Sequence, residues 1–243
     1  MSLYDRNYVH NRAAERPQER MEREAYEEPG IRSEADLAAF VKKTYQLFAA
    51  SCLAATAGAY VGIGMAPTIQ NWYWGLVILE FAMLFGLMFT RKQPGLNLVM
   101  LFGFTFMTGL TLAPLLSVIL AMPGGGSIVA QAFFLTAVIT GGLSLFAMNT
   151  TRDFSGMGKG LFIALIIVIV ASVINIFLGS PLLQVVIAGV GALLFSAFIL
   201  FDTQRIIRGE FATPVEAAVA IYLDVLNLFI SLLQLLGIFG REE

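Results

Sequence analysis

Long apolar blocks separated by short polar connections make up most of the chain, after a polar stretch at the front. There are seven blocks, each of about 19 to 27 residues. A helix rises ~1.5 Å per residue and needs about 20 residues to cross the ~30 Å hydrocarbon layer of a bilayer. Every block is therefore long enough to span a membrane. The blocks cover residues 45–65, 72–90, 96–122, 128–148, 160–178, 182–207 and 215–239.

The continuous apolar runs favour helices over strands. An open sheet would leave backbone groups unpaired in lipid, and a membrane barrel would show short alternating segments. The composition agrees, because 58% of residues are hydrophobic and only 13% are charged, against roughly 25% charged in soluble domains. We therefore predict an all-α polytopic membrane protein with seven transmembrane helices.

The domain organisation follows from where the polar residues lie. Residues 1–43 are mixed in charge and poor in large apolar side chains, a composition typical of flexible, solvated segments. The other connections are too short to hold a second domain. We expect a flexible cytoplasmic tail over 1–43 and one seven-helix transmembrane domain over 44–243.

The basic residues indicate the orientation. Of the fifteen Lys and Arg, eight precede the first block, the connections after the second and fourth blocks carry two each, and Arg205 and Arg208 lie at the end of the sixth block and just after it. The connections after the first, third and fifth blocks carry none. The positive-inside rule then places the N-terminus and the basic connections in the cytoplasm and the C-terminus outside.

Three carboxylates fall inside the predicted spans: Glu80, Asp202 and Asp224. A charge at the bilayer centre costs about 2.5 to 3.5 kcal/mol on insertion scales, so each needs a reason. Asp202 can pair with Arg205, three positions on along the same helix. Glu80 can be a hydrogen-bonded structural acid. Asp224 has no basic residue within a turn on its own helix, so it needs a partner from elsewhere or a proton.

The seventh span carries a polar stripe. Its members Asp224, Asn227, Ser231 and Gln234 follow steps of three, four and three, and fall within about 80° of the helix circumference. A stripe of this kind must face protein or water, so we expect the seventh helix to be central in the bundle.

Two of the acids are predicted to meet. The sixth and seventh spans are joined by a short connection and run antiparallel, so Asp202 and Asp224 reach similar depth if they face one another. Two acids in a low-dielectric site tend to share a proton, and their ionised oxygens are hard ligands suited to Ca²⁺. Arg91, at the end of the second span, can compete for one carboxylate as a latch, with Asn227 and Arg205 as supporting polar residues.

Three runs resemble the bacterial branch of the Bax inhibitor-1 (transmembrane Bax inhibitor motif) family. They are residues 198–207 (FILFDTQRII), 220–234 (AIYLDVLNLFISLLQ) and 109–114 (GLTLAP). The two runs that contain aspartate are specific in their order and spacing, whereas the third alone is only supportive.

This resemblance implies a seven-helix fold with the last helix central and a pH-sensitive calcium leak. By the same resemblance, Asp202 and Asp224 match the family's pH-sensing and cation-binding pair, Arg91 its latch, and Glu80 an acid in the middle of the second helix. One departure is Phe201, where many relatives carry Tyr, so a hydroxyl near the pair is absent.

Other functions are weighed beside the leak. A non-transporting regulator would bind other membrane proteins, such as a membrane-anchored protease, and would depend on the tail. An intramembrane aspartyl protease also uses two aspartates, but the Tyr-Leu-Asp-Val around Asp224 lacks the glycine of those enzymes.

Hydrolytic and nucleic-acid chemistry find no support in the sequence. The only histidine, His10, is in the polar tail, so the membrane region lacks a triad base or histidine metal site. No basic face for nucleic acid occurs in a folded region. We expect no enzyme and no resident cofactor, with Ca²⁺ and H⁺ as passing ligands, in a bacterial inner membrane.

Overall fold

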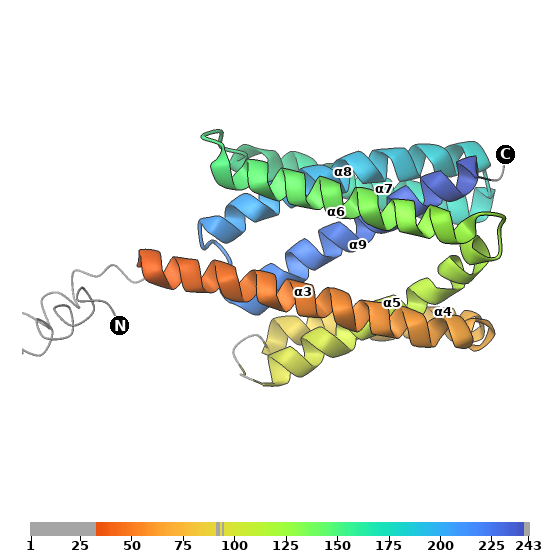
Figure 1. The fold of residues 1–243 in the computed structure, drawn as a ribbon, viewed down its shortest axis with the longest axis horizontal. Helices are drawn as coiled ribbons and strands as arrows, with labels where there is room; N and C mark the ends of the chain where they lie inside the picture. The colour runs from red at the N-terminus through yellow and green to blue at the C-terminus, as the bar shows by residue number, and fades with distance from the viewer. Residues whose placement is uncertain (1–32, 91–92, 94, 241–243) are drawn as a thin grey trace, which may run out of the picture. The chain divides into compact units, whose positions relative to one another are not determined.

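The computed structural model describes residues 33–90, 93 and 95–240, and these residues form helices joined by short connections, with no strand among them (Figure 1). Seven of the helices are long and apolar enough to cross a membrane. This confirms the predicted all-α, seven-span architecture. The helices are α3 (Glu34–Gly64), α4 (Ala66–Thr90), α5 (Leu96–Leu120), α6 (Gly125–Asn149), α7 (Gly158–Leu178), α8 (Pro181–Ile207) and α9 (Pro214–Phe239), with a 3₁₀ turn η1 (Ser155–Met157) before α7.

The first two helices are longer than their apolar blocks. Helix α3 starts at Glu34, ahead of the block expected from residue 45, and exposes Lys42 and Lys43. The backbone N–H of Asp36 donates to Ser33 Oγ at 3.1 Å, an N-cap that satisfies an otherwise free helix donor. Hydropathy marks the part of a helix that suits lipid, and the cap sets where the helix begins.

Two proline-containing caps fix the starts of α8 and α9. The hydroxyl of Ser180 accepts from Leu183 N at 3.3 Å, and that of Thr213 accepts from Glu216 N at 3.2 Å. In both helices the next residue is proline, which suits the first helical position because its missing N–H would have no intrahelical partner. The turn between them passes through Gly209 at φ 68°, so the polypeptide returns quickly and α9 packs along α8.

Helix α9 is the element around which the buried residues gather. Val219 and Tyr222 pack with side chains of α3, α4 and α5, including Leu87 and Phe104. Ile221 packs with Ile199 and Phe195 of α8. Farther along, Leu233 packs with residues of α5 and α6. The expected central position of the seventh span is therefore confirmed, and α9 lies beside α5, α6 and α8 (Figure 1).

Helices α3 and α5 approach each other at two glycines. A Cβ on Gly109 would lie 1.9 Å from the carbonyl oxygen of Ala55, and one on Gly58 would lie 2.0 Å from that of Phe106. Both distances are far below van der Waals contact. In lipid, close backbone approach of this kind replaces the hydrophobic effect as the source of helix association.

Candidate functional site

Asp202 lies one turn before the end of α8 and is buried. Its Oδ1 accepts a hydrogen bond from Arg205 Nη1 at 2.9 Å, an ion pair between positions i and i+3 of one helix. Charge-assisted bonds of this kind are the stronger class of hydrogen bond. The local pairing that the sequence allowed for Asp202 is present in the structure.

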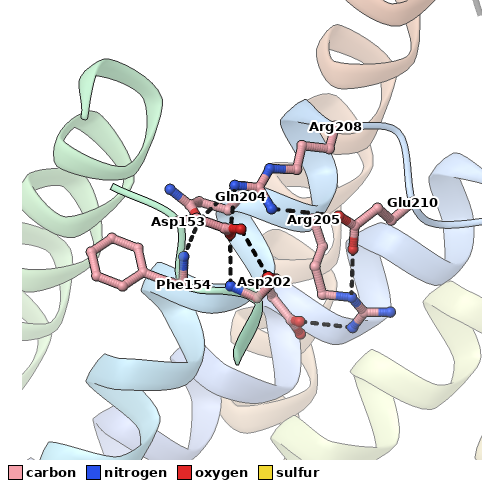
Figure 2. A network of polar contacts seen from close by, with 8 residues as sticks. Asp153, Phe154, Asp202, Gln204, Arg205, Arg208 and Glu210 are labelled. Atoms are coloured by element: carbon pink, nitrogen blue, oxygen red, sulfur yellow. Dashed lines mark hydrogen bonds and ion pairs between the residues drawn. The ribbon is translucent and has the colours of Figure 1, made fainter. Parts of the chain in front are cut away.

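Arg205 has further contacts on its other sides, and Figure 2 shows the one with Glu210. Its Nε lies 3.6 Å from Glu210 Oε2 in the α8–α9 connection. The guanidinium carbon lies 4.1 Å from the centre of the Phe211 ring and 5.4 Å from that of Phe201, both within cation–π range. Phe201 therefore contributes a ring face to the arginine beside Asp202.

The polar network continues from Glu210 to the α6–α7 connection (Figure 2). Arg208 Nη1 lies 3.9 Å from Glu210 Oε1, and Arg208 Nη2 lies 2.8 Å from Asp153 Oδ1. Hydrogen bonds from the Ser155 backbone N–H and then from Arg208 hold the pKa of Asp153 below its ordinary value. Acid and base alternate along this chain of contacts.

Gln204 ties the same connection to α8. Its side-chain oxygen accepts from Phe154 N at 2.9 Å, and its side-chain nitrogen donates to the carbonyl oxygen of Arg152 at 2.7 Å. Arg208 Nη2 also donates to the side-chain oxygen of Gln204, over a longer distance of 3.3 Å. The start of α7 is thereby anchored to the helix that carries Asp202.

Asp224 lies on α9 and is buried. In the described part of the chain, no hydrogen-bond donor reaches its Oδ2. Asp224 lies close enough to Asp202 and Arg205 on α8 for electrostatic interaction. An unpaired buried carboxylate oxygen is costly, and the sequence predicts a partner from another element or a proton for Asp224.

The described residues contain no group of three or more His, Cys, Asp and Glu side chains that could hold a metal ion. Ca²⁺ takes six to eight oxygen ligands as a rule. Two carboxylates such as Asp202 and Asp224 fall short of a coordination sphere of that size.

Glu80 belongs to a different part of the molecule. It lines a cavity of about 820 Å³ bounded by α4, α5 and α9, together with Thr111, Asn227 and Gln234. Thr111 donates a hydrogen bond to Glu80 Oε1. The Asn227 side chain, which also lines this cavity, donates to the carbonyl oxygen of Leu223 at 2.7 Å. Among the described residues it has no hydrogen bond to either aspartate.

The sequence reasoning missed the hydroxyl groups of α5. The Thr108 hydroxyl lies 2.5 Å from that of Tyr222 on α9, and Thr111 bonds Glu80 on α4. The two threonines are three residues apart, so they lie on one helical face. That spacing, in a span otherwise rich in large apolar residues, was the available signal.

Arg91, the predicted latch, lies outside the described residues, as do residues 1–32 of the tail. The structure pairs Asp202 with Arg205 on α8, puts Asp224 on the adjacent helix α9, and places Glu80 and Asn227 at the cavity bounded by α4, α5 and α9. The arrangement defines a multi-pass helical membrane protein with acidic groups inside its bundle.

Comparison with known proteins identifies the family. Residues 37–241 match the model described as "Inhibitor of apoptosis-promoting Bax1", and the chain belongs to this Bax inhibitor family. An uncharacterised Campylobacter jejuni protein is 50% identical, over 100% of both chains. A Vibrio cholerae protein named as an uncharacterised membrane protein is 40% identical, over 84% of this chain and 91% of its own. The Golgi anti-apoptotic protein of vaccinia virus is 33% identical, over 84% of this chain and 87% of its own.

Proposed function

We propose that this protein is a pH-sensitive leak for Ca²⁺ and similar cations, gated by Asp202 and Asp224. The observation that carries the proposal is the buried Asp224 oxygen without a hydrogen-bond donor, on a side chain that interacts with the charge of Asp202. Two acids so placed respond to protons, and their oxygens suit a hard cation.

The two protonation states of the pair have opposite consequences. When the acids hold a proton, they can hydrogen-bond to each other and offer little negative charge, so the path is closed. When both are ionised, their mutual repulsion is relieved by a cation between them. Flux therefore rises with pH.

The cavity between α4, α5 and α9 would form the part of the ion path that lies beyond the aspartate pair. Its acidic and amide side chains, Glu80, Asn227 and Gln234, can replace part of the hydration shell of a cation. No Lys or Arg is among the described residues that line it, so this part of the lining presents no fixed positive charge to an incoming ion.

The proposed orientation follows the basic residues. Arg152 and Lys159 flank the α6–α7 connection, and Arg205 and Arg208 lie at the α8–α9 connection. We place these connections and the N-terminus in the cytoplasm, and the C-terminus outside. The bacterial relatives support an inner-membrane location.

The proposed role needs neither enzymatic chemistry nor a resident cofactor. In an intramembrane aspartyl protease, both aspartates would have to be free to bind and activate one water molecule. Here the Oδ1 of Asp202 is paired with Arg205 at 2.9 Å, which disfavours that use.

The test is Ca²⁺ flux into proteoliposomes of the full-length protein across about pH 5 to 8. We expect flux that increases with pH and that is reduced in both Asp202→Asn and Asp224→Asn. Flux no greater than in empty liposomes at every pH would contradict the proposal.

A second candidate is a non-transporting regulator that binds other membrane proteins, such as a membrane-anchored protease. The name of the vaccinia relative, which describes it as anti-apoptotic, favours this class. A regulator would lose activity when the tail over residues 1–43 is removed and would keep it in Asp202→Asn and Asp224→Asn. The leak has the opposite dependence.

A further inference from the structure

Arg205 lies between two acidic side chains that differ in how far they are buried. Its Nη1 is 2.9 Å from Asp202 Oδ1, and its Nε is 3.6 Å from Glu210 Oε2. The side chain of Asp202 is 8% exposed and that of Glu210 is 41% exposed. The shorter contact is thus to the buried acid, and the longer one is to the acid in the α8–α9 connection.

Two aromatic rings limit where the guanidinium of Arg205 can go. Phe201 comes from α8, and Phe211 comes from the connection that also holds Glu210. A planar guanidinium can slide along ring faces without losing the cation–π contact. The guanidinium already contacts both Asp202 and Glu210, so a small shift along these rings exchanges one acid for the other.

Glu210 is held in place as an alternative acceptor. Its backbone N–H donates to the carbonyl oxygen of Arg205 at 3.0 Å, which fixes the connection against the end of α8. Its second oxygen lies 3.9 Å from Arg208, whose closer partner is Asp153 at 2.8 Å. Arg208 therefore competes only weakly for Glu210, so Glu210 stays available to Arg205.

We infer that Arg205 is a positioning residue that sets how accessible Asp202 is to a cation, with Glu210 as its second acceptor. Paired with Asp202, Arg205 neutralises that carboxylate and places a fixed positive charge beside the acidic pair. Displaced toward Glu210, it leaves the Asp202 oxygens free to bind the passing ion. The inference rests on the proposed leak. It adds that the Arg205–Asp202 pair, within α8, helps to keep the ion path closed.

Two substitutions are expected to act in opposite directions. In the Ca²⁺ flux assay with full-length protein, Arg205→Gln removes the positive charge and raises flux by about two- to fivefold, the range that corresponds to a partly exposed ion pair. Glu210→Gln leaves Asp202 as the one acidic partner of Arg205 within the described part of the chain, and it lowers flux. Arg205→Lys keeps a charge within reach of Asp202 and stays closer to wild type than Arg205→Gln.

The matched control is Lys159→Gln, which removes the same charge from an exposed position at the start of α7 and should leave flux unchanged. The inference is overturned if Arg205→Gln and Glu210→Gln shift flux in the same direction, or if neither shifts it while Asp202→Asn abolishes it. Absence of Ca²⁺ flux in wild type contradicts the proposed leak itself. That result needs no variant, so it is distinct from a failure of the inference about Arg205. If Arg205→Gln does not fold, Glu210→Gln and Arg205→Lys decide the outcome.

Discussion

Thr111 on α5 donates a hydrogen bond to Glu80 on α4, inside the cavity that these helices form with α9. The pair gives a carboxylate in the middle of a membrane span a donor from another helix. It joins α4 to α5 by a polar contact at a depth where water competes little for hydrogen bonds.

Removing this donor should weaken the packing of α4 on α5. We expect Thr111→Val to lower the free energy of unfolding by about 0.6 to 2 kcal/mol, the range for polar contacts between membrane helices. Thermal unfolding in detergent measures the change. Thr56→Val is the matched control, since the Thr56 hydroxyl is exposed and bonds only its own helix, at Cys52 O. Equal melting temperatures for Thr111→Val and wild type would show that the bond contributes nothing.

Gly109→Ala should separate α3 from α5. The new methyl would lie 1.9 Å from the carbonyl oxygen of Ala55, so the two backbones have to move apart at a cost of about 1 to 3 kcal/mol. Gly141→Ala is the control, because a Cβ there meets nothing within 4 Å. We expect the first variant to lose thermal stability in detergent and the second to keep it. A stable Gly109→Ala would mean that the helices are not held by this contact.

Asp153 provides a pH-dependent contribution to stability. Its pKa is lowered in the folded protein by hydrogen bonds from the Ser155 N–H and from Arg208. A lowered folded-state pKa stabilises the fold above the ordinary pKa of aspartate, and the effect is lost as the pH falls through the lowered value. Asp153→Asn should therefore melt at a lower temperature than wild type near neutral pH, and the difference should shrink in acid. Melting curves across a pH series measure this. A difference in melting temperature between the two proteins that is equal in acid and near neutral pH would contradict the prediction.

Gln204 should control the order of the α6–α7 connection. Gln204→Leu removes the acceptor of Phe154 N and the donor to the Arg152 carbonyl oxygen, which costs about 1 to 3 kcal/mol if the freed groups stay buried. Hydrogen exchange over residues 150–157 should become faster. Gln131→Leu is the control, because the Gln131 amide is exposed and donates to Ser127 within its own helix. Unchanged exchange over 150–157 in Gln204→Leu would show that Gln204 is not the anchor.

Hydropathy and helical spacing predicted the parts of the structure that depend on single segments. The seven spans follow from the lengths of the apolar blocks, and the Asp202–Arg205 pair follows from a three-residue separation on one helix. The central position of α9 followed from its polar stripe, which could not face lipid. In each case the controlling property lies within about 25 residues of sequence.

The contacts between helices could not be predicted in the same way. Thr111 meets Glu80 because of how α5 is rotated and shifted against α4, and Arg208 meets Asp153 because of how the α6–α7 connection lies against the end of α8. Sequence fixes which residues share a face of one helix, but not which face of the neighbour it meets. The early start of α3 was also missed, because it depends on the cap at Ser33 and not on hydropathy. The role of Asp202 and Asp224 in gating stays a prediction.

The measurement that tests this role most directly is a double-mutant cycle of Ca²⁺ flux in proteoliposomes, with wild type, Asp202→Asn, Asp224→Asn and the double variant, each across the same pH range. Groups that act as one unit give strongly non-additive effects. We predict that each single variant loses the pH dependence of flux and that the double variant is no more impaired than either one. Two independent losses that multiply in the double variant, or pH-dependent flux that survives in both single variants, would contradict the account.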